Sequence, residues 1–351
     1  GRTEPEAVHL GGRLRAGGQV IEKDTGTLKT KSAGTNRFVK ALSQSGVVLI
    51  FAVLLVGFAI LTNGVSIRMS NIRSMLISTA ATGLMAIGMT LVIIDRGIDL
   101  SVGGVAAISS AVGAICMTRL NVPWGFSVLI MLLIGVLVGF LNGVSIAILR
   151  MPPFICTMAM LKITTGTAHY ILGGTTIYGL SPQHAVFGQS YFLSVPVCVW
   201  MLAVFMSIAF LVLRYSSFGR ELYAMGGNPK AAWTAGINVR RNRILIYIVC
   251  GFMASVGALV ITSKIMCAQV SIGEGSELDA IASAVIGGVS MAGGEGGAMG
   301  AVLGAIVINM INNGLNLMRV SPYIQTAIKG LVIFVAVAAD VIRRRKELDQ
   351  Y

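Results

Sequence analysis

Long apolar stretches alternate with short polar connections along the chain, from about residue 45 to residue 342. A helix needs roughly 20 apolar residues to cross the hydrocarbon core of a bilayer, so each stretch is a candidate membrane span. The ten candidate spans are 45–62, 72–94, 100–118, 124–149, 153–171, 195–213, 244–266, 280–292, 298–316 and 323–342. Because the eighth stretch is short and interrupted by glycine, nine spans or a re-entrant segment remain alternatives. The pattern predicts an all-α membrane protein, a polytopic helical bundle of about ten transmembrane helices.

The composition agrees with this pattern. Hydrophobic residues make up 55% of the 351 residues and charged residues only 12%, and the mean hydropathy is +0.82. A soluble domain cannot hide this much apolar surface in one core. We therefore expect membrane lipid to surround much of the chain.

The formal net charge of +13 raises the possibility of a nucleic-acid partner, but the positions of the charges argue against it. Basic residues are concentrated in the loop 214–243, directly after the last span at 343–346, and in the tail before the first span. Short basic loops stay on the cytoplasmic side of a membrane. Both termini are therefore predicted to be cytoplasmic, and no nucleic-acid partner is expected.

The chain divides into three parts by composition. Residues 1–42 are polar and rich in glycine and threonine, which predicts a disordered cytoplasmic tail. Residues 43–343 form the membrane domain, whose longest polar connection is the cytoplasmic loop 214–243, and residues 344–351 form a basic cytoplasmic tail. The five cysteines lie singly in apolar segments, so we expect buried free thiols rather than a metal site or disulfides.

The loop 214–243 contains a short segment with every signal of a capped helix. Asn228 is a good N-cap, Pro229 suits the first helical position, Ala231 and Ala232 favour the interior, and Gly236 ends the helix. A helix of two turns is not stable alone, so it must be held by flanking spans or dock on another molecule. Docking on a partner and resting on lipid headgroups through Trp233 are alternative interpretations.

The same segment carries a resemblance to a known family. The spacing Lys230-Ala231-Ala232 to Gly236 is similar to the cytoplasmic loop of binding-protein-dependent permeases, with lysine in place of the usual glutamate. Further stretches resemble the ribose-type sugar permeases of the ABC importers, in matching order and spacing: GMTLVI at 88–93, GIDLSVG at 97–103, FGRELYAMGGN at 218–228, AGINV at 235–239, ELDAIA at 277–282, IGGVSMAGG at 286–294 and NNGLNL at 312–317. Arg96 departs from the family, which usually has a small residue there.

The resemblance implies a transport subunit of the bacterial inner membrane rather than an enzyme. Such subunits pair as homo- or heterodimers, contact cytoplasmic ATP-binding subunits and receive a monosaccharide such as ribose from a periplasmic sugar-binding protein. The residues carried over to the contact with the ATPase are Gly226, Asn228, Pro229, Ala231, Ala232 and Gly236. The sequence has no GxxxxGK[ST] loop, so ATP and Mg²⁺ are expected in the partner subunit, and no cofactor or metal in this chain.

Polar residues in or beside the spans are candidates for a translocation path or gate. They are Asp99, Ser101, Asn142, Gln269, Glu277, Asp279, Asn312, Asn313 and Asn316. Asp99 and Ser101 also have a simpler interpretation as helix caps, and the amides also join neighbouring helices by hydrogen bonds. Glu277 and Asp279 precede the short eighth stretch, and short or broken helices commonly flank solute sites.

Small residues recur at every fourth position on two spans. The first series comprises Gly135, Gly139 and Gly143, and the second comprises Gly296, Gly300 and Gly304. Such spacing lets two helix backbones approach closely, either within one chain or across a dimer. The sequence leaves both alternatives open.

Two other classes of function fit the sequence less well. An intramembrane enzyme lacks support, because no HExxH motif or paired carboxylate lies inside a span. A secondary, ion-coupled transporter is the remaining alternative, since it too would be a bundle of apolar helices. It is expected to carry ionisable groups deep within its helices, whereas nearly all the acidic residues here lie at segment ends.

Overall fold

A computed structural model describes residues 50–348, with side chains described as far as Ile342. The tail at 1–42, the start of the first predicted span and the last residues of the basic tail lie outside these residues. The predicted boundary at 343 is not a structural break, because the last helix continues to Leu348.

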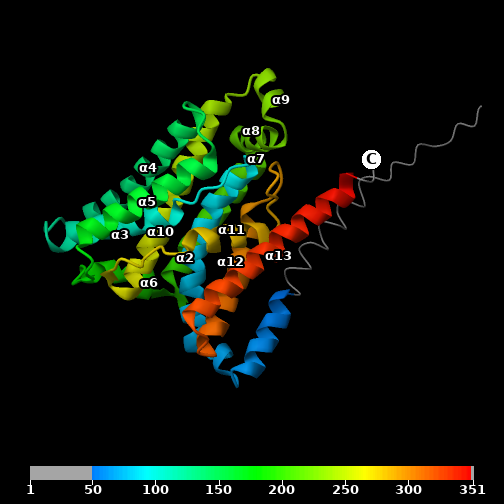
Figure 1. Cartoon of the computed structure of the whole chain (residues 1–351). Coiled ribbons are helices and arrows are strands. Elements are labelled where there is room, and N and C mark those ends of the chain that lie inside the picture. The colour runs from blue at the N-terminus through cyan, green and yellow to red at the C-terminus, as the bar shows by residue number, and fades with distance from the viewer. Residues whose placement is uncertain (1–49, 349–351) are drawn as a thin grey trace, which may run out of the picture. The chain divides into compact units, whose positions relative to one another are not determined.

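The described chain is almost entirely helical (Figure 1). Its main helices are Ile50–Leu61, α2 (Met69–Ile94), α3 (Val102–Thr118), α4 (Trp124–Ala147), α5 (Pro153–Leu172), α7 (Val197–Tyr215), α10 (Val239–Ile265), α12 (Ala298–Leu317) and α13 (Pro322–Leu348). The shorter ones are η1 (Val65–Ile67), η2 (Pro182–Ala185), α6 (Val186–Gln189), α8 (Ser217–Gly227), α9 (Pro229–Thr234) and α11 (Ser276–Ile286). These positions confirm an all-α, polytopic membrane protein.

The strands are confined to two short antiparallel pairs. β1 (Ile177–Tyr178) pairs with β4 (Cys267–Ala268), with Ile177 opposite Ala268. β2 (Tyr191–Phe192) pairs with β3 (Val195–Pro196), with Tyr191 opposite Pro196. Each strand has two residues, so the pairs only fasten the connections between helices.

Six of the described helices are long and apolar enough to cross a membrane: α2, α4, α7, α10, α12 and α13. Each predicted span overlaps a helix within the described residues, although the eighth, 280–292, extends six residues beyond the end of its helix. The eighth is the 11-residue helix α11, which is short as its sequence predicts. The loop 214–243 is shorter than predicted, because α7 extends to Tyr215 and α10 begins at Val239.

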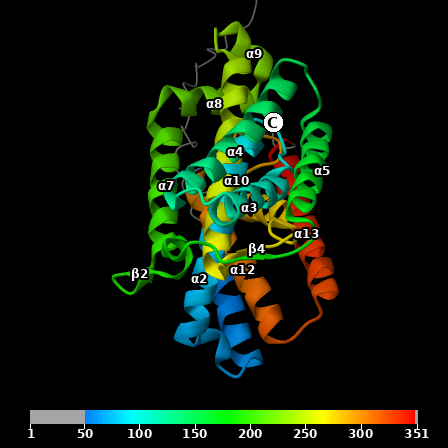
Figure 2. The ribbon, with the colours of Figure 1, turned by 90° about the vertical axis from the view of Figure 1, so that its left-hand side faces the viewer.

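The core lies around α2. In the most apolar part of α2, 89% of the residues are buried inside the described chain, whereas no residue in that part of α13 is fully buried. Figure 2 shows α7 and α5 on opposite sides of α4 and α10. Exposed apolar side chains on the outer helices, including Leu137, Ile163 and Phe334, face the surroundings that a bilayer supplies.

Both series of small residues are packing faces within the chain. A Cβ atom on Gly135, Gly139 or Gly143 of α4 would clash with the backbone of α10, and one on Gly300 or Gly304 of α12 would clash with the backbone of α11. Without side chains between them, the helix backbones pack directly against each other, which provides dispersion contacts that lipid cannot replace. The faces that carry Gly135, Gly139, Gly143, Gly300 and Gly304 are therefore occupied by contacts within the chain.

Candidate functional site: a capped helix and the polar breaks of the bundle

The helix α9 confirms the capped segment that the sequence predicts. Asn228 is its N-cap, and its Oδ1 accepts hydrogen bonds from the backbone N–H groups of Lys230 and Ala231, both at 3.1 Å. At the other end Gly236 has φ +86°, and Ile237 N–H donates to the Ala232 carbonyl at 3.1 Å. This closing pattern requires a left-handed residue at Gly236, which explains the glycine.

α9 has one face against the chain and one face open. Ala232 is 4% exposed, whereas Trp233 is 71% exposed. Lys230, Ala231 and Thr234 are exposed as well. Flanking helices therefore hold α9 in place, and its outer face is free to contact a partner.

The preceding helix, α8, is joined closely to the end of α2. Gly226 leaves no room for a Cβ atom, which would clash with the carbonyl oxygen of Ile94. Arg96, with φ +63°, donates hydrogen bonds to the Gly226 and Gly227 carbonyls. The residue that departs from the family pattern thus ties the turn after α2 to the helix before α9.

The segment between α11 and α12 meets α8 at the same point. Gly294 N–H donates to the Ile94 carbonyl at 2.9 Å, and Tyr223 Oη donates to the Gly296 carbonyl at 2.7 Å. Burial raises the pKa of Tyr223, which keeps the phenol protonated as a donor. The end of α2, α8 and the 287–297 segment therefore form one connected junction.

Asp95, the C-cap residue that follows α2, forms an ion pair with α10. Arg243 Nε lies 2.6 Å from Asp95 Oδ2, and a second bond from Arg243 reaches Oδ1 at 3.2 Å. Burial raises the pKa of Asp95, and the Arg243 guanidinium opposes that shift. Asp95 is therefore paired across the bundle with Arg243 rather than with its neighbour in sequence, Arg96.

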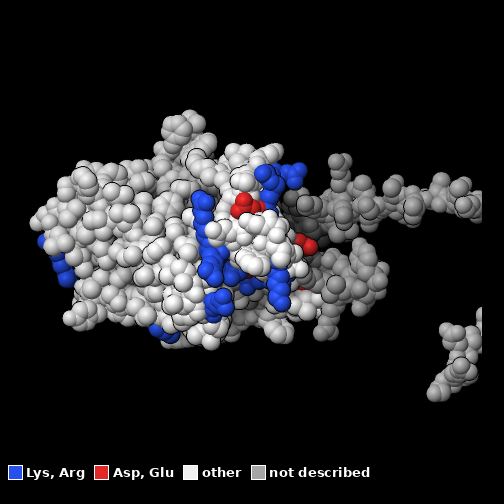
Figure 3. All heavy atoms as spheres, turned by 90° about the horizontal axis from the view of Figure 1, so that it is seen from above, with Lys and Arg blue, Asp and Glu red and all other residues white. Residues whose placement is uncertain are grey.

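The surface around α8 and α9 is basic. Figure 3 shows lysine and arginine side chains gathered at this end, with few acidic ones among them. Exposed basic residues on it are Arg150, Arg214, Arg220, Lys230, Arg240 and Arg241. Such a distribution is typical of the cytoplasmic end of a membrane protein.

Asp99, Ser101 and Asn142 come together at the break between α2 and α3. Asp99 Oδ1 accepts bonds from Ser101 N–H at 2.9 Å and Ser101 Oγ at 2.6 Å, and Asn142 Nδ2 donates to Ser101 Oγ at 2.8 Å. All three side chains are almost fully buried. Asp99 therefore shapes the start of α3 and Asn142 joins α4 to it, which favours the structural interpretation of this group.

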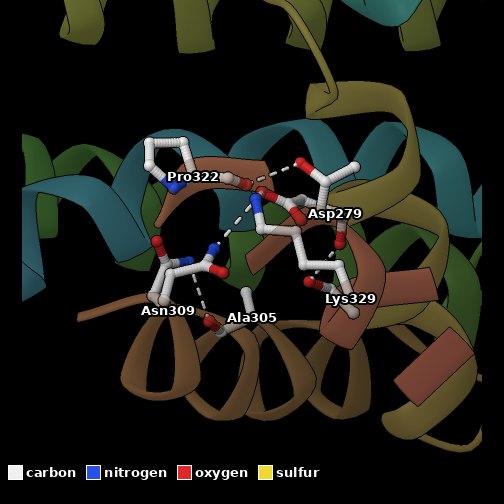
Figure 4. Close-up of polar contacts among 8 residues, drawn as sticks. Asp279, Ala305, Asn309, Pro322 and Lys329 are labelled. Atoms are coloured by element: carbon white, nitrogen blue, oxygen red, sulfur yellow. Dashed lines mark hydrogen bonds and ion pairs between the residues drawn. The ribbon is translucent and has the colours of Figure 1, made fainter. Parts of the chain in front are cut away.

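Asp279 pairs with a lysine from the outer helix α13 (Figure 4). Lys329 Nζ lies 3.1 Å from Asp279 Oδ2, and Asn312 Nδ2 donates to the same oxygen at 3.4 Å. The pair lies between α11 and α13, with Asp279 side chain 16% exposed and Lys329 28% exposed. A charged lysine inside an apolar helix is costly unless it has such a partner or faces a water-filled cavity.

The remaining predicted amides mostly join helices. Asn313 exchanges two hydrogen bonds with Asn71 of α2, at 2.8 and 2.9 Å. Asn316 Oδ1 accepts a bond from Gln325 Nε2 of α13 at 3.0 Å. Gln269 is half-buried beside β4. The predicted path residues thus fall into separate groups rather than one continuous line.

Two buried carboxylate oxygens have no hydrogen-bond partner among the described residues, Asp99 Oδ2 and Glu277 Oε2. Only Glu277 also lines a pocket. The carboxylate lies against Gly103 of α3, where an added Cβ would clash with it. A carboxylate oxygen in this position is available to a ligand.

The described residues contain no group of three or more histidine, cysteine, aspartate or glutamate side chains that could hold a metal ion. All five cysteines are buried free thiols, as the sequence predicts. The candidate path residues named from the sequence are acidic, amide and hydroxyl groups, so they do not include Lys162 and Lys329, which lie within α5 and α13. A basic residue inside an otherwise apolar stretch is the signal that could have found them.

Comparison with known proteins identifies the family to which this chain belongs. The family model described as branched-chain amino acid transport system / permease component matches residues 71–337, and the chain belongs to this family. It is a multi-pass membrane protein of the bacterial inner membrane.

Individual relatives indicate which kind of permease the chain resembles. The chain is 37% identical over 300 residues to the ribose import permease protein RbsC of Haemophilus influenzae, covering 84% of this chain and 93% of the relative. It is 39% identical over 272 residues to RbsC of Bacillus subtilis, covering 77% and 84%. It is 33% identical over 330 residues to the galactose/methyl galactoside import permease protein MglC of Haemophilus influenzae, covering 89% and 98%. No solved structure matches the chain. These relatives confirm the resemblance to ribose-type permeases.

Proposed function

We propose that this chain is the permease subunit of an ATP-binding cassette importer that carries a monosaccharide, such as ribose, into the cell. The observation that carries the proposal is α9, a capped helix held by the bundle with Trp233 and Ala231 facing outward. A secondary carrier has no need of such a helix. The similarity to ribose and galactose import permeases supports a sugar as the solute.

The proposed arrangement has α9 and both ends of the chain on the cytoplasmic side, with about ten helices in the membrane. The basic surface around α9 supports this orientation. Two permease subunits, identical or different, would enclose the path, and a periplasmic binding protein would deliver the sugar. ATP and Mg²⁺ would be bound by the cytoplasmic partners.

The junction at Gly226 suggests how the ATPase would drive the bundle. Movement of α9 passes to α8, whose Gly226 packs on Ile94 and whose carbonyls bind Arg96. The same junction contacts the 287–297 segment, which leads directly into α11 and α12. Alternating access would follow from this movement because packed elements shift between discrete arrangements.

Reconstitution tests the proposal. The chain would be co-expressed with the ATP-binding and solute-binding subunits encoded beside it, and the complex placed in proteoliposomes with labelled ribose, galactose, xylose or leucine. We expect ATP-dependent uptake of a sugar, stimulated by the loaded binding protein. Uptake driven by an ion gradient without ATP would overturn the proposal. Uptake of leucine alone would rule out a sugar as the transported solute.

A further inference from the structure

A pocket of about 280 Å³ lies between α3, α5 and the segment that leads into α11. Its polar lining residues are Lys162, Thr165, His169, Ser271, Glu274 and Glu277, and Leu161 and Ile272 add apolar surface. The volume lies near the lower end of the roughly 300–1,000 Å³ typical of small-molecule sites. The pocket therefore suits a small solute.

Within the described residues, none of the charged groups of this pocket forms an ion pair. Lys162 lies halfway along α5 and is exposed. The ion pairs among the described residues are Asp95–Arg243 and Asp279–Lys329, so Lys162, Glu274 and Glu277 are not paired. Ionisable side chains within membrane helices are costly unless they face a partner or a water-filled cavity, and they often mark solute pathways.

The N-termini of two helices meet beside the pocket. α3 begins at Val102 and α11 at Ser276. Gly103 and Gly273 make this approach possible, because a Cβ on Gly103 would clash with both the Glu277 carboxylate and the Gly273 carbonyl. Helix N-termini inside a membrane commonly flank solute sites. The unpartnered Glu277 Oε2 lies at this meeting point.

The lining matches the chemistry of a polyol. A carboxylate accepts hydrogen bonds from neighbouring hydroxyls, and an ammonium group donates to hydroxyl oxygens. His169 Nε2 donates to the Val270 carbonyl at 3.1 Å, which leaves its Nδ1 to face a hydroxyl. Leu161 and Ile272 supply surface for the C–H face of a sugar ring. A second copy of the chain could also bring counter-ions to this place, but both signs of charge stand together inside one concavity, which favours a solute.

We propose that this pocket is a transient binding site for the neutral, polyhydroxylated solute during its passage, with Glu277 and Lys162 as its hydrogen-bonding groups. This inference rests on the proposed function. It adds residues that determine which solutes the permease accepts. Binding at this place follows release from the binding protein, so it governs uptake more than the signal to the ATPase.

Transport by the whole reconstituted importer provides the first test. In Glu277→Gln and Lys162→Met we expect sugar uptake to fall at least about tenfold. ATPase stimulation by the loaded binding protein should stay within about twofold of the control Thr167→Ala, which changes an exposed residue of α5 outside the lining. The ratio of ribose to galactose uptake should also change in the two variants, which a general loss of folded protein would not cause.

The outcomes separate the two proposals. If the wild type takes up sugar with ATP and both variants match Thr167→Ala, the pocket proposal is overturned while the proposed function stands. If the wild type shows no ATP-dependent sugar uptake, the proposed function fails and the pocket proposal with it.

Thiol labelling provides a second test that needs no loss of function. Thr165→Cys places one accessible thiol in the pocket, and the native cysteines are all buried. In the whole complex, millimolar ribose or galactose should slow its reaction with a membrane-impermeant maleimide at least about threefold, and leucine should not. A rate that sugars leave unchanged, protection by leucine alone, or sugar-independent crosslinking to a second copy would overturn the proposal.

Discussion

Arg243 Nε lies 2.6 Å from Asp95 Oδ2, so an ion pair joins the first turns of α10 to the residue that ends α2. The Asp95 side chain is 2% exposed and Arg243 is 25% exposed. Both line a cavity of about 480 Å³ that also touches Pro229, the first residue of α9. The pair therefore fixes two central helices beside the proposed contact with the ATPase.

Removing one member of this pair should be costly. Arg243→Met leaves Asp95 buried without its counter-ion, and we expect a loss of about 3–5 kcal/mol in the free energy of unfolding. Arg240→Met, three residues earlier and exposed, should change it by less than about 0.5 kcal/mol. Thermal unfolding of the purified protein in detergent measures both, and the double variant with Asp95→Asn should recover part of the loss. Equal stability of the two single variants would contradict a structural role for the pair.

Neighbouring alanines of α9 should respond differently to the same substitution. Ala232→Leu forces a larger side chain into a buried position, with an expected cost of about 1–3 kcal/mol. Ala231→Leu changes only the exposed face, so the thermal midpoint should hold while ATP-driven uptake falls several-fold. Uptake by reconstituted Ala231→Leu at the wild-type rate would argue against docking through this face.

The contact between α4 and α10 predicts a severe effect of side chains at its glycines. Gly139→Leu would push against the backbone at Tyr247, so we expect the folded protein to be lost or its thermal midpoint to fall sharply. Gly125→Leu is the matched control on the same helix, where a Cβ meets nothing within 4 Å. Size-exclusion profiles in detergent compare the two. A monodisperse, stable Gly139→Leu protein would show that the helices can separate.

His184 predicts a dependence of stability on acid pH. Burial lowers the pKa of His184 to about 4 in the folded chain, and Thr262 Oγ1 lies 2.9 Å from its Nε2. The unfolded chain binds this proton near pH 6.5, so stability is full above that pH and falls as the pH drops toward 4. Between pH 8 and pH 5 the loss should be about 2 kcal/mol.

Two matched variants test whether His184 is the group responsible for this pH dependence of stability. Thermal midpoints of His184→Gln measured over this range should change less with pH than those of the wild type. His169→Gln alters an exposed histidine and should keep the wild-type slope. If the slope of His184→Gln equals that of the wild type, another group is responsible.

Features that depend on neighbouring residues were predictable from the sequence. The apolar stretches predicted the helices, and Asn228, Pro229 and Gly236 predicted α9, because spans and caps follow from local periodicity and local hydrogen bonding. The short α11 was predicted for the same reason. Arg96 illustrates the limit: its departure from the family was visible, but not its bonds to Gly226 and Gly227, more than a hundred residues away.

Partners brought together by packing were not predictable. Nothing in the sequence pairs Asp279 with Lys329, because the direction of each side chain depends on how α11 and α13 lie against each other. The amides showed that polar groups were present but not which of them share a hydrogen bond. The pocket beside Glu277 combines residues from three separate segments, and no single motif carries it.

The glycine contact between α4 and α10 has a mechanical consequence. Because three successive turns of α4 pack backbone to backbone on α10, the two helices cannot slide or tilt against each other without atoms overlapping. α10 begins five residues after α9 ends. A displacement of α9 would therefore rotate α4 and α10 together as one rigid body. Relative movement between helices would then occur elsewhere in the bundle, and α4 and α10 would act as one rigid unit of the permease.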